Sequence, residues 1–312
     1  INFRDSRNRL LELAGNHCSF NVMLDDTYIL HGNLRKFLRS ARGDTTADSY
    51  SIVISDIDSK YNSNRITKPE KGMRYMYRIH EIIQSENNKL NLLVPETYGY
   101  IEDLSTQQMV SRSNDRKYKD LQLLYEELED DPKNPRTYYY IADTYLYLKD
   151  YGNAYEWYKK RIACEETGNK GEYQSSLYYI AVIGLYFLEK PWSEVMTTLI
   201  DCYNFDTTKS EALYIIGKYY KDKGNSKTAY MFLEYAYNLG LPEIQMNFRK
   251  HIYEFHILAE LLELCYIEKK YTLGASLAEK LYNQKKEDRW MTWKNIYDLL
   301  VYYENMNKHE LI

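Results

Sequence analysis

The feature that most constrains the fold is an internal repeat in the second half of the chain. The stretch Tyr138-x2-Ile141-Ala142-x2-Tyr145 has a counterpart in Ile216-Gly217-x2-Tyr220. Each is followed, twelve residues after its small residue, by a second small residue, Ala154 or Ala229. Small residues let two helices approach closely, and large residues nearby fill the groove between neighbouring pairs. The pattern therefore predicts a stack of antiparallel helix pairs.

The spacing of the copies indicates the kind of repeat. Weaker copies run over Tyr179–Tyr203 and Leu261–Leu281, and the equivalent first-helix positions are 142, 183, 217 and 262. The intervals are 41, 34 and 45 residues, and an interval of about 34 is typical of tetratricopeptide (TPR) repeats. We therefore expect residues 113–312 to form an irregular, all-α TPR-like array whose aromatic residues mostly pack between helices.

Residues 1–112 have a different secondary-structure pattern, in which short helices alternate with β-like runs. Helices are predicted over Arg4–Ala14, ended by Gly15-Asn16, and over His31–Arg42. Strands are predicted over Phe20–Leu24 (buried), Tyr50–Ile57, Ser63–Thr67 and Met73–Ile83, the last two separated by a turn at Pro69–Gly72. This order predicts an α/β or α+β domain.

Composition excludes several classes of protein. The net charge of −4 gives no basic surface of the kind that binds a phosphate backbone, so nucleic acid is not expected as the main partner. The four cysteines lie far apart, which disfavours a zinc site or disulfides and favours reduced core thiols in an intracellular, cytoplasmic protein. No apolar run reaches about 18 residues, so no membrane span is expected.

Two acidic residues follow the first predicted strand. Asp25 and Asp26 would lie at its carboxyl end, the edge where open α/β sheets bind ligands. Two adjacent carboxylates repel each other unless a cation joins them, and hard oxygen ligands suit Mg²⁺ or Mn²⁺. The alternative is a turn with solvated acids.

Two further groups could carry chemistry. His80 could be a metal ligand and Glu81 a general base at the end of the alternating strand. The alternative is an ordinary edge-strand histidine beside a surface glutamate. Arg7 and Asn8, in the first turns of a helix, could contact a phosphate, or they could simply belong to a surface helix.

Taken in order, five stretches resemble family-2-like glycosyltransferases that carry a C-terminal TPR region. These stretches are RDSRN, FNVMLDDT, YNSNRI, GMRYMYRIHE and DPKNPRTYYYIADTY. The resemblance implies a partial GT-A-like domain over residues 1–112 that transfers a sugar from a nucleotide-sugar donor to a protein or glycan acceptor. It also implies that the family's first βαβ segment is missing, so that either the chain is a fragment or truncated product, or the missing half is supplied elsewhere.

The resemblance assigns a role to each candidate residue. Arg7, Asn8, Asp25 and Asp26 would bind the donor, and Asp25, Asp26 and His80 would hold Mg²⁺ or Mn²⁺. Glu81 would act as the base, or an acid elsewhere such as Asp103 would serve instead. The metal motif departs from the family pattern because Thr27 stands where a second acid is common.

The alternative is a non-catalytic TPR scaffold for protein interaction with a decayed glycosyltransferase remnant. Either protein could form a homodimer through its TPR region. The sequence leaves open whether the chain is an enzyme.

Overall fold

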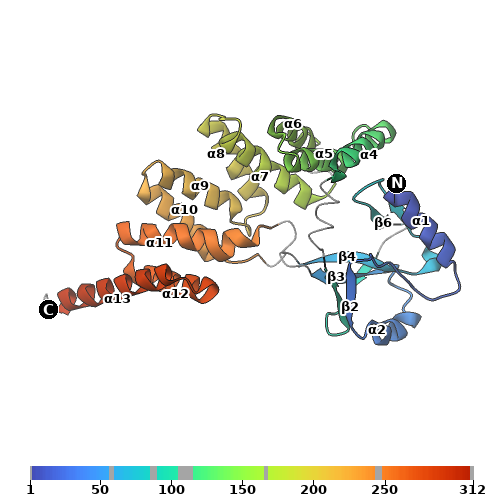
Figure 1. The fold of residues 1–312 in the computed structure, drawn as a ribbon, viewed down its shortest axis with the longest axis horizontal. Coiled ribbons are helices and arrows are strands. Elements are labelled where there is room, and N and C mark those ends of the chain that lie inside the picture. The colour runs from blue at the N-terminus through green and yellow to red at the C-terminus, as the bar shows by residue number, and fades with distance from the viewer. Residues whose placement is uncertain are drawn as a thin grey trace. The chain divides into compact units, whose positions relative to one another are not determined.

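The chain is described from a computed structural model that covers residues 2–55, 60–84, 90–104, 115–164, 168–242 and 248–309. It divides into two compact units, Ile1–Gly168 and Asn169–Ile312 (Figure 1). Among the described residues, no helix is long and apolar enough to cross a membrane.

The first unit contains a six-stranded mixed sheet. Its order is β1-β4-β3-β8-β2, with β7 paired to β3. The strands are β1 (Asn21–Val22), β2 (Tyr28–Gly32), β3 (Ser49–Ser55), β4 (Lys60–Thr67), β7 (Asn91–Leu93) and β8 (Gly99–Asp103). β3 runs parallel to β7 and β8, whereas the β1–β4, β3–β4 and β2–β8 pairs are antiparallel. Its core contains Tyr50, Ile52, Ile54, Ile66 and Ile101 together with Leu34 of α2 (Leu34–Ser40).

The antiparallel pairs correct part of the fold prediction. A GT-A-like domain implies a largely parallel sheet flanked by helices, and the described strands form a small mixed sheet instead. The predicted buried strand Phe20–Leu24 is also wrong, because β1 has two residues at the sheet edge and leaves Val22 and Leu24 exposed. The predicted helix His31–Arg42 starts late, since His31 belongs to β2.

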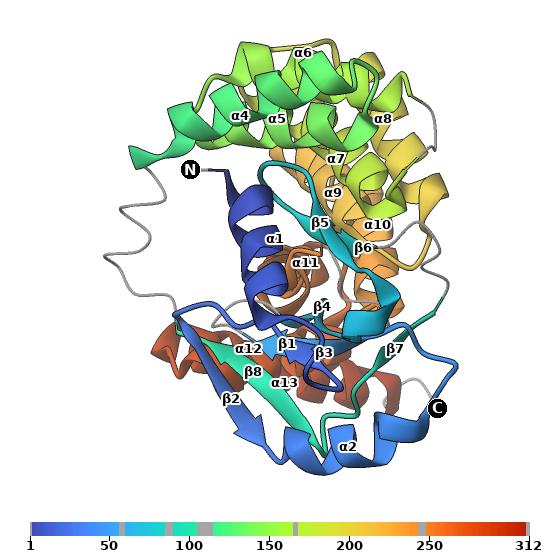
Figure 2. The same ribbon diagram turned by 90° about the vertical axis from the view of Figure 1, so that its right-hand side faces the viewer.

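A second part of this unit is a β-hairpin that lies beside α1 (Phe3–Ala14) (Figure 2). The strand predicted over Met73–Ile83 is in fact two short strands, β5 (Arg74–Met76) and β6 (Ile82–Gln84), paired antiparallel. The chain reverses between them through Tyr77 and His80, whose φ angles of 67° and 52° are unusual for residues other than glycine. The helix over Arg4–Ala14 and its end at Gly15 are confirmed.

Three helices complete the first unit: α4 (Lys117–Asp130), α5 (Pro135–Tyr147) and α6 (Tyr151–Ile162). Asn134 caps α5 by accepting hydrogen bonds from two backbone N–H groups of its first turn, and Pro135 supplies a first helical residue that needs no such bond. Ala142 of α5 and Ala154 of α6 are fully buried, as the repeat pattern predicts.

The second unit continues as helices. They are α7 (Lys170–Tyr186), α8 (Trp192–Phe205), α9 (Glu211–Asp222), α10 (Ser226–Leu239), the π-helix η3 (Ile252–His256), α11 (Ile257–Ile267), α12 (Tyr271–Lys285) and α13 (Asp288–His309). Figure 1 shows consecutive helices packed as antiparallel neighbours. Gly217 of α9 lies directly on Leu233 of α10, so the small position of the repeat is where two helices meet. The helical repeat array is therefore confirmed.

Candidate functional site

Three residues singled out from the sequence meet in one cluster of charges. Arg7 on α1 pairs through Nη2 with Asp25 Oδ1 at 2.8 Å and through Nε with the carboxylate of Glu81. Arg65, from β4, pairs through Nη1 with the other Asp25 oxygen at 3.2 Å. These four residues, named the charge cluster below, join α1, β4, the segment after β1 and the hairpin.

The charge cluster is balanced, with two guanidinium groups and two carboxylates. Burial on its own would lower the pKa of Arg7, but Glu81 and Asp25 raise that pKa overall, so the guanidinium stays charged. Both oxygens of Asp25 already accept from arginines. Such an arrangement ties secondary-structure elements together, and a metal ion would have to displace an arginine to reach Asp25.

The predicted metal centre finds no support in this geometry. Within the described ranges, no three His, Cys, Asp or Glu side chains are grouped so that they could hold a metal ion. Asp26 is exposed beside the cluster. Binding of Mg²⁺ or Mn²⁺ and a catalytic role for Glu81 stay untested predictions.

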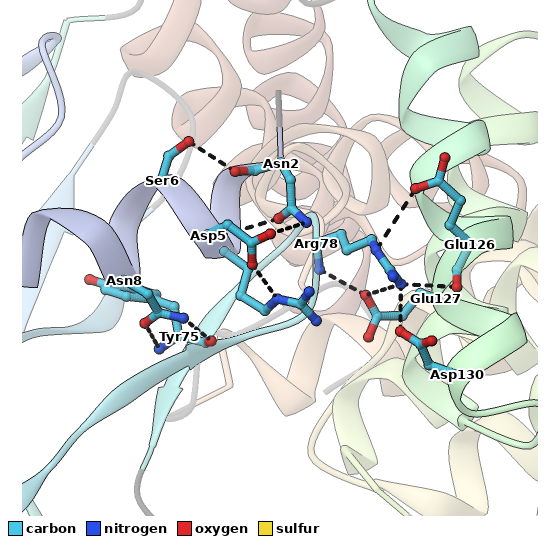
Figure 3. A network of polar contacts seen from close by, with 10 residues as sticks. Asn2, Asp5, Ser6, Asn8, Tyr75, Arg78, Glu126, Glu127 and Asp130 are labelled. Carbon is cyan, nitrogen blue, oxygen red and sulfur yellow. Dashed lines mark hydrogen bonds and ion pairs between the residues drawn. The ribbon is translucent and has the colours of Figure 1, made fainter. Parts of the chain in front are cut away.

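Asn8 and His80 have structural contacts. Asn8 Nδ2 donates to the backbone oxygen of Tyr75 at 2.9 Å, and the Tyr75 N–H donates to Asn8 Oδ1 at 2.7 Å, which fastens α1 to β5 (Figure 3). The His80 ring stacks on Tyr140 of α5 with centroids 3.8 Å apart. Burial and the nearby Arg136 lower the pKa of His80 to about 3, so the ring is neutral at ordinary pH.

Arg78 is a residue whose importance the sequence did not reveal. Its backbone N–H donates to Glu127 Oε2 at 2.8 Å, and its Nη1 pairs with Asp130 Oδ2 at 2.8 Å and donates to the Glu126 carbonyl at 2.9 Å (Figure 3). The tip of the hairpin is thereby held on α4. No local pattern marks this contact, because the partners lie about fifty residues apart in the sequence.

The second unit contains a pocket of about 750 Å³. It is named the helix-end pocket here, because three groups of residues line it: the first turns of α7, the α8–α9 connection and the end of α10. Its lining residues are Lys170, Gly171, Gln174, Phe205, Asp206, Thr207, Thr208, Lys209, Leu239, Leu241 and Pro242. Its lining combines apolar side chains with hydroxyl, amide and charged groups, the mixture typical of ligand sites.

Lys209 is the most buried charged group of this lining. Only 7% of Lys209 is exposed, its Nζ donates to Gln174 Oε1 at 2.9 Å, and Asp206 lies 3.9 Å away. One oxygen of Asp206 is already bound by the N–H and hydroxyl of Thr208. Lys170 adds a second positive charge at the exposed rim.

Behind Lys209 lies a buried polar layer that supports the pocket. Tyr253 Oη donates to Glu211 Oε2 at 2.6 Å, and the Arg249 N–H donates to Glu211 Oε1 at 3.1 Å. The Arg249 guanidinium lies 3.7 Å from the ring centroid of Tyr178. Burial raises the pKa of the neighbouring Cys202 thiol to about 12, which makes it an unreactive core residue.

Comparison with known proteins adds the following. No protein-family model matches the chain, and no curated protein matches it. The similar solved structures include MamA (TM-score 0.43, 14% identity, 59% of this chain and 98% of that one). They also include the C-terminal part of a TPR repeat-containing protein from Cytophaga hutchinsonii (0.46, 16%, 63% and 70%). A third is YrrB, described as a TPR protein with an unusual peptide-binding site (0.40, 13%, 58% and 84%).

The resemblance to family-2-like glycosyltransferases is wrong, because the N-terminal sheet lacks the largely parallel arrangement that a GT-A domain implies. The predictions of a nucleotide-sugar donor and a glycan acceptor are left without support, because both rested on this resemblance. Of the alternative, a TPR scaffold, the structure supports the helical repeat array.

Proposed function

We propose that the chain is an interaction scaffold whose second unit binds a segment of a partner protein in the helix-end pocket. The observation that carries the proposal is the pocket itself, about 750 Å³ in volume and lined by α7, the α8–α9 connection and the end of α10. Helical repeats form extended surfaces of this kind, and their loops and helix ends often form the binding face.

The lining indicates the chemistry of the partner segment. The side chains of Phe205, Leu239 and Leu241 contribute apolar surface to the pocket, which suits an aliphatic or aromatic side chain. The lining contains two lysines, Lys170 and Lys209, and one acid, Asp206, so its formal net charge is +1. An acidic side chain next to an apolar one on the partner complements this surface.

Affinity capture with charge-reversed variants tests the proposal. Lys170→Glu changes the exposed rim of the pocket, and Lys227→Glu makes the same change on an exposed residue of α10 outside the lining. We expect the full chain and Lys227→Glu to retain a partner that Lys170→Glu loses, with amine cross-links from Lys170 to that partner. Equal retention by both variants would exclude the pocket, and no retained partner for any form would exclude the scaffold.

Association of two copies through the helix pairs remains a prediction. Light scattering of the full chain over a range of concentrations measures it directly. A mass that stays at one chain at all concentrations would contradict it.

A further inference from the structure

Helix α13 has apolar side chains on two opposite faces. On one face, Trp290 and Tyr297 are buried, and the Tyr297 ring lies against Gly274 of α12. On the other face, named the terminal stripe here, five large side chains are between 39% and 58% exposed: Ile296, Leu299, Tyr302, Tyr303 and Met306. Figure 1 shows α13 running beside α12. Packing on α12 uses the first face, so the contiguous terminal stripe indicates a binding surface.

The spacing within the terminal stripe fits another helix as its partner. Ile296, Leu299, Tyr303 and Met306 follow one another at intervals of three, four and three residues. This spacing forms the a and d seam of a two-stranded coiled coil. In an antiparallel pair of these helices centred on Val301, Ile296 faces Met306 of the other copy, and Leu299 faces Tyr303. Each large or branched side chain of the seam then meets a different one, so the stripe is complementary to itself.

The lack of charge along this seam favours a second copy of the chain over a different protein. Contact between two identical surfaces brings like charges together, which is unfavourable wherever the surface is charged. The positions that flank the seam are uncharged: Asn295, Leu300 and Tyr302. The nearest charged residues along its length, Asp298 and Glu304, lie about 120° away around the helix. Flanking charges are what select a different partner in coiled coils, and this seam has none.

The exposed area is large enough for a reversible dimer. A fully exposed large side chain has roughly 200 Å² of accessible surface, so the exposed parts of the stripe amount to about 500 Å² in one copy. Two copies together would bury about 1,000 Å², the lower limit for a specific protein–protein interface. We therefore expect a dissociation constant on the order of micromolar rather than an obligate dimer.

We propose that two copies of this chain associate through the terminal stripe, with their α13 helices antiparallel. The inference rests on the association of copies proposed above and names the surface that forms it. It does not depend on the helix-end pocket, which lies on α7, the α8–α9 connection and the end of α10.

Sedimentation velocity of the full chain, from nanomolar to high micromolar concentrations, tests the proposal. Leu299→Glu places a carboxylate in the seam and should weaken association by about thirtyfold or more. Leu299 is 54% exposed, so the melting temperature measured at nanomolar concentration should not change. The matched control is Met231→Glu on α10, where the residue is 57% exposed, and it should associate like the natural chain.

Mixing two variants tests the antiparallel alignment. Leu299→Glu and Tyr303→Lys each disrupt two layers in a dimer of their own kind. In a mixed dimer, the new carboxylate at position 299 of one copy faces the new ammonium at position 303 of the other, and the equivalent second layer keeps its natural pair. The mixture should therefore associate about tenfold more tightly than either variant alone. In a parallel pair the two new charges would lie in different layers.

Three results would overturn the inference. A mass of one chain at every concentration would exclude both the association of copies and the stripe. An association that Leu299→Glu leaves intact would exclude the stripe alone. A mixture of the two variants that stays monomeric would exclude the antiparallel alignment. Capture of a partner by the helix-end pocket is measured separately with Lys170→Glu, which should form the dimer normally.

Discussion

Gly217 offers a direct test of how closely the repeat helices pack. A methyl group added at this position would lie 2.6 Å from Leu233 Cγ and 3.3 Å from the Ala229 carbonyl oxygen. Leu233 is fully buried, and Cγ is a branch point that cannot swing away. Gly217→Ala should gain about 1 kcal/mol from helix propensity and lose about 1–3 kcal/mol from overpacking. The net expectation is a loss of up to about 2 kcal/mol.

Gly152 provides the matched control for this change. It lies exposed in the first turn of α6, and the nearest atom to an added methyl group is an Asp150 oxygen at 3.9 Å. Gly152→Ala should therefore stabilise the chain by about 0.5–1 kcal/mol. Urea unfolding, followed by far-ultraviolet circular dichroism, measures both variants. If Gly217→Ala stabilised the chain as much as Gly152→Ala, the close helix contact in α9–α10 would not exist.

The remaining predictions concern other packed contacts. Gly274→Ala should destabilise more than Gly217→Ala, because its methyl group would lie 2.3 Å from the ring of the fully buried Tyr297; the same urea series measures it. Arg78→Met should cost about 1–3 kcal/mol and expose the hairpin tip to protease, because it leaves the α4 carboxylates without their shared cation; unchanged cleavage would contradict this. Because the pKa of His80 is lowered in the folded chain, the unfolded chain binds a proton at a pH at which the folded chain does not. The free energy of unfolding therefore falls as the pH drops from 6.5 towards 3. His80→Asn should make that fall shallower by up to about 1.4 kcal/mol per pH unit, and an unchanged slope in urea titrations would refute it.

The repeat array could be predicted because its signal is local. Ala142 and Gly217 mark where one helix contacts the next, and the structure places both in such contacts. Helix periodicity and capping residues such as Asn134 act within a few positions of the chain. A single sequence contains these features in full.

The hairpin could not be predicted, because its reversal has no local signal. The alternation over Met73–Ile83 continues through the turn, and Tyr77 and His80 take up left-handed backbone conformations without any glycine. What holds them is distant: Arg136 lies over Tyr77, and Tyr140 stacks on His80. Tertiary contacts override the strand propensity here.

The candidate site shows the same division between near and distant partners. Sequence reasoning brought Arg7, Asp25 and Glu81 to one place but treated Asp25 as a metal ligand and Glu81 as a base. It overlooked Arg65, which follows Asp25 by forty residues and completes the neutral charge cluster. A pair of carboxylates is a metal site only when no cation of the protein already neutralises it.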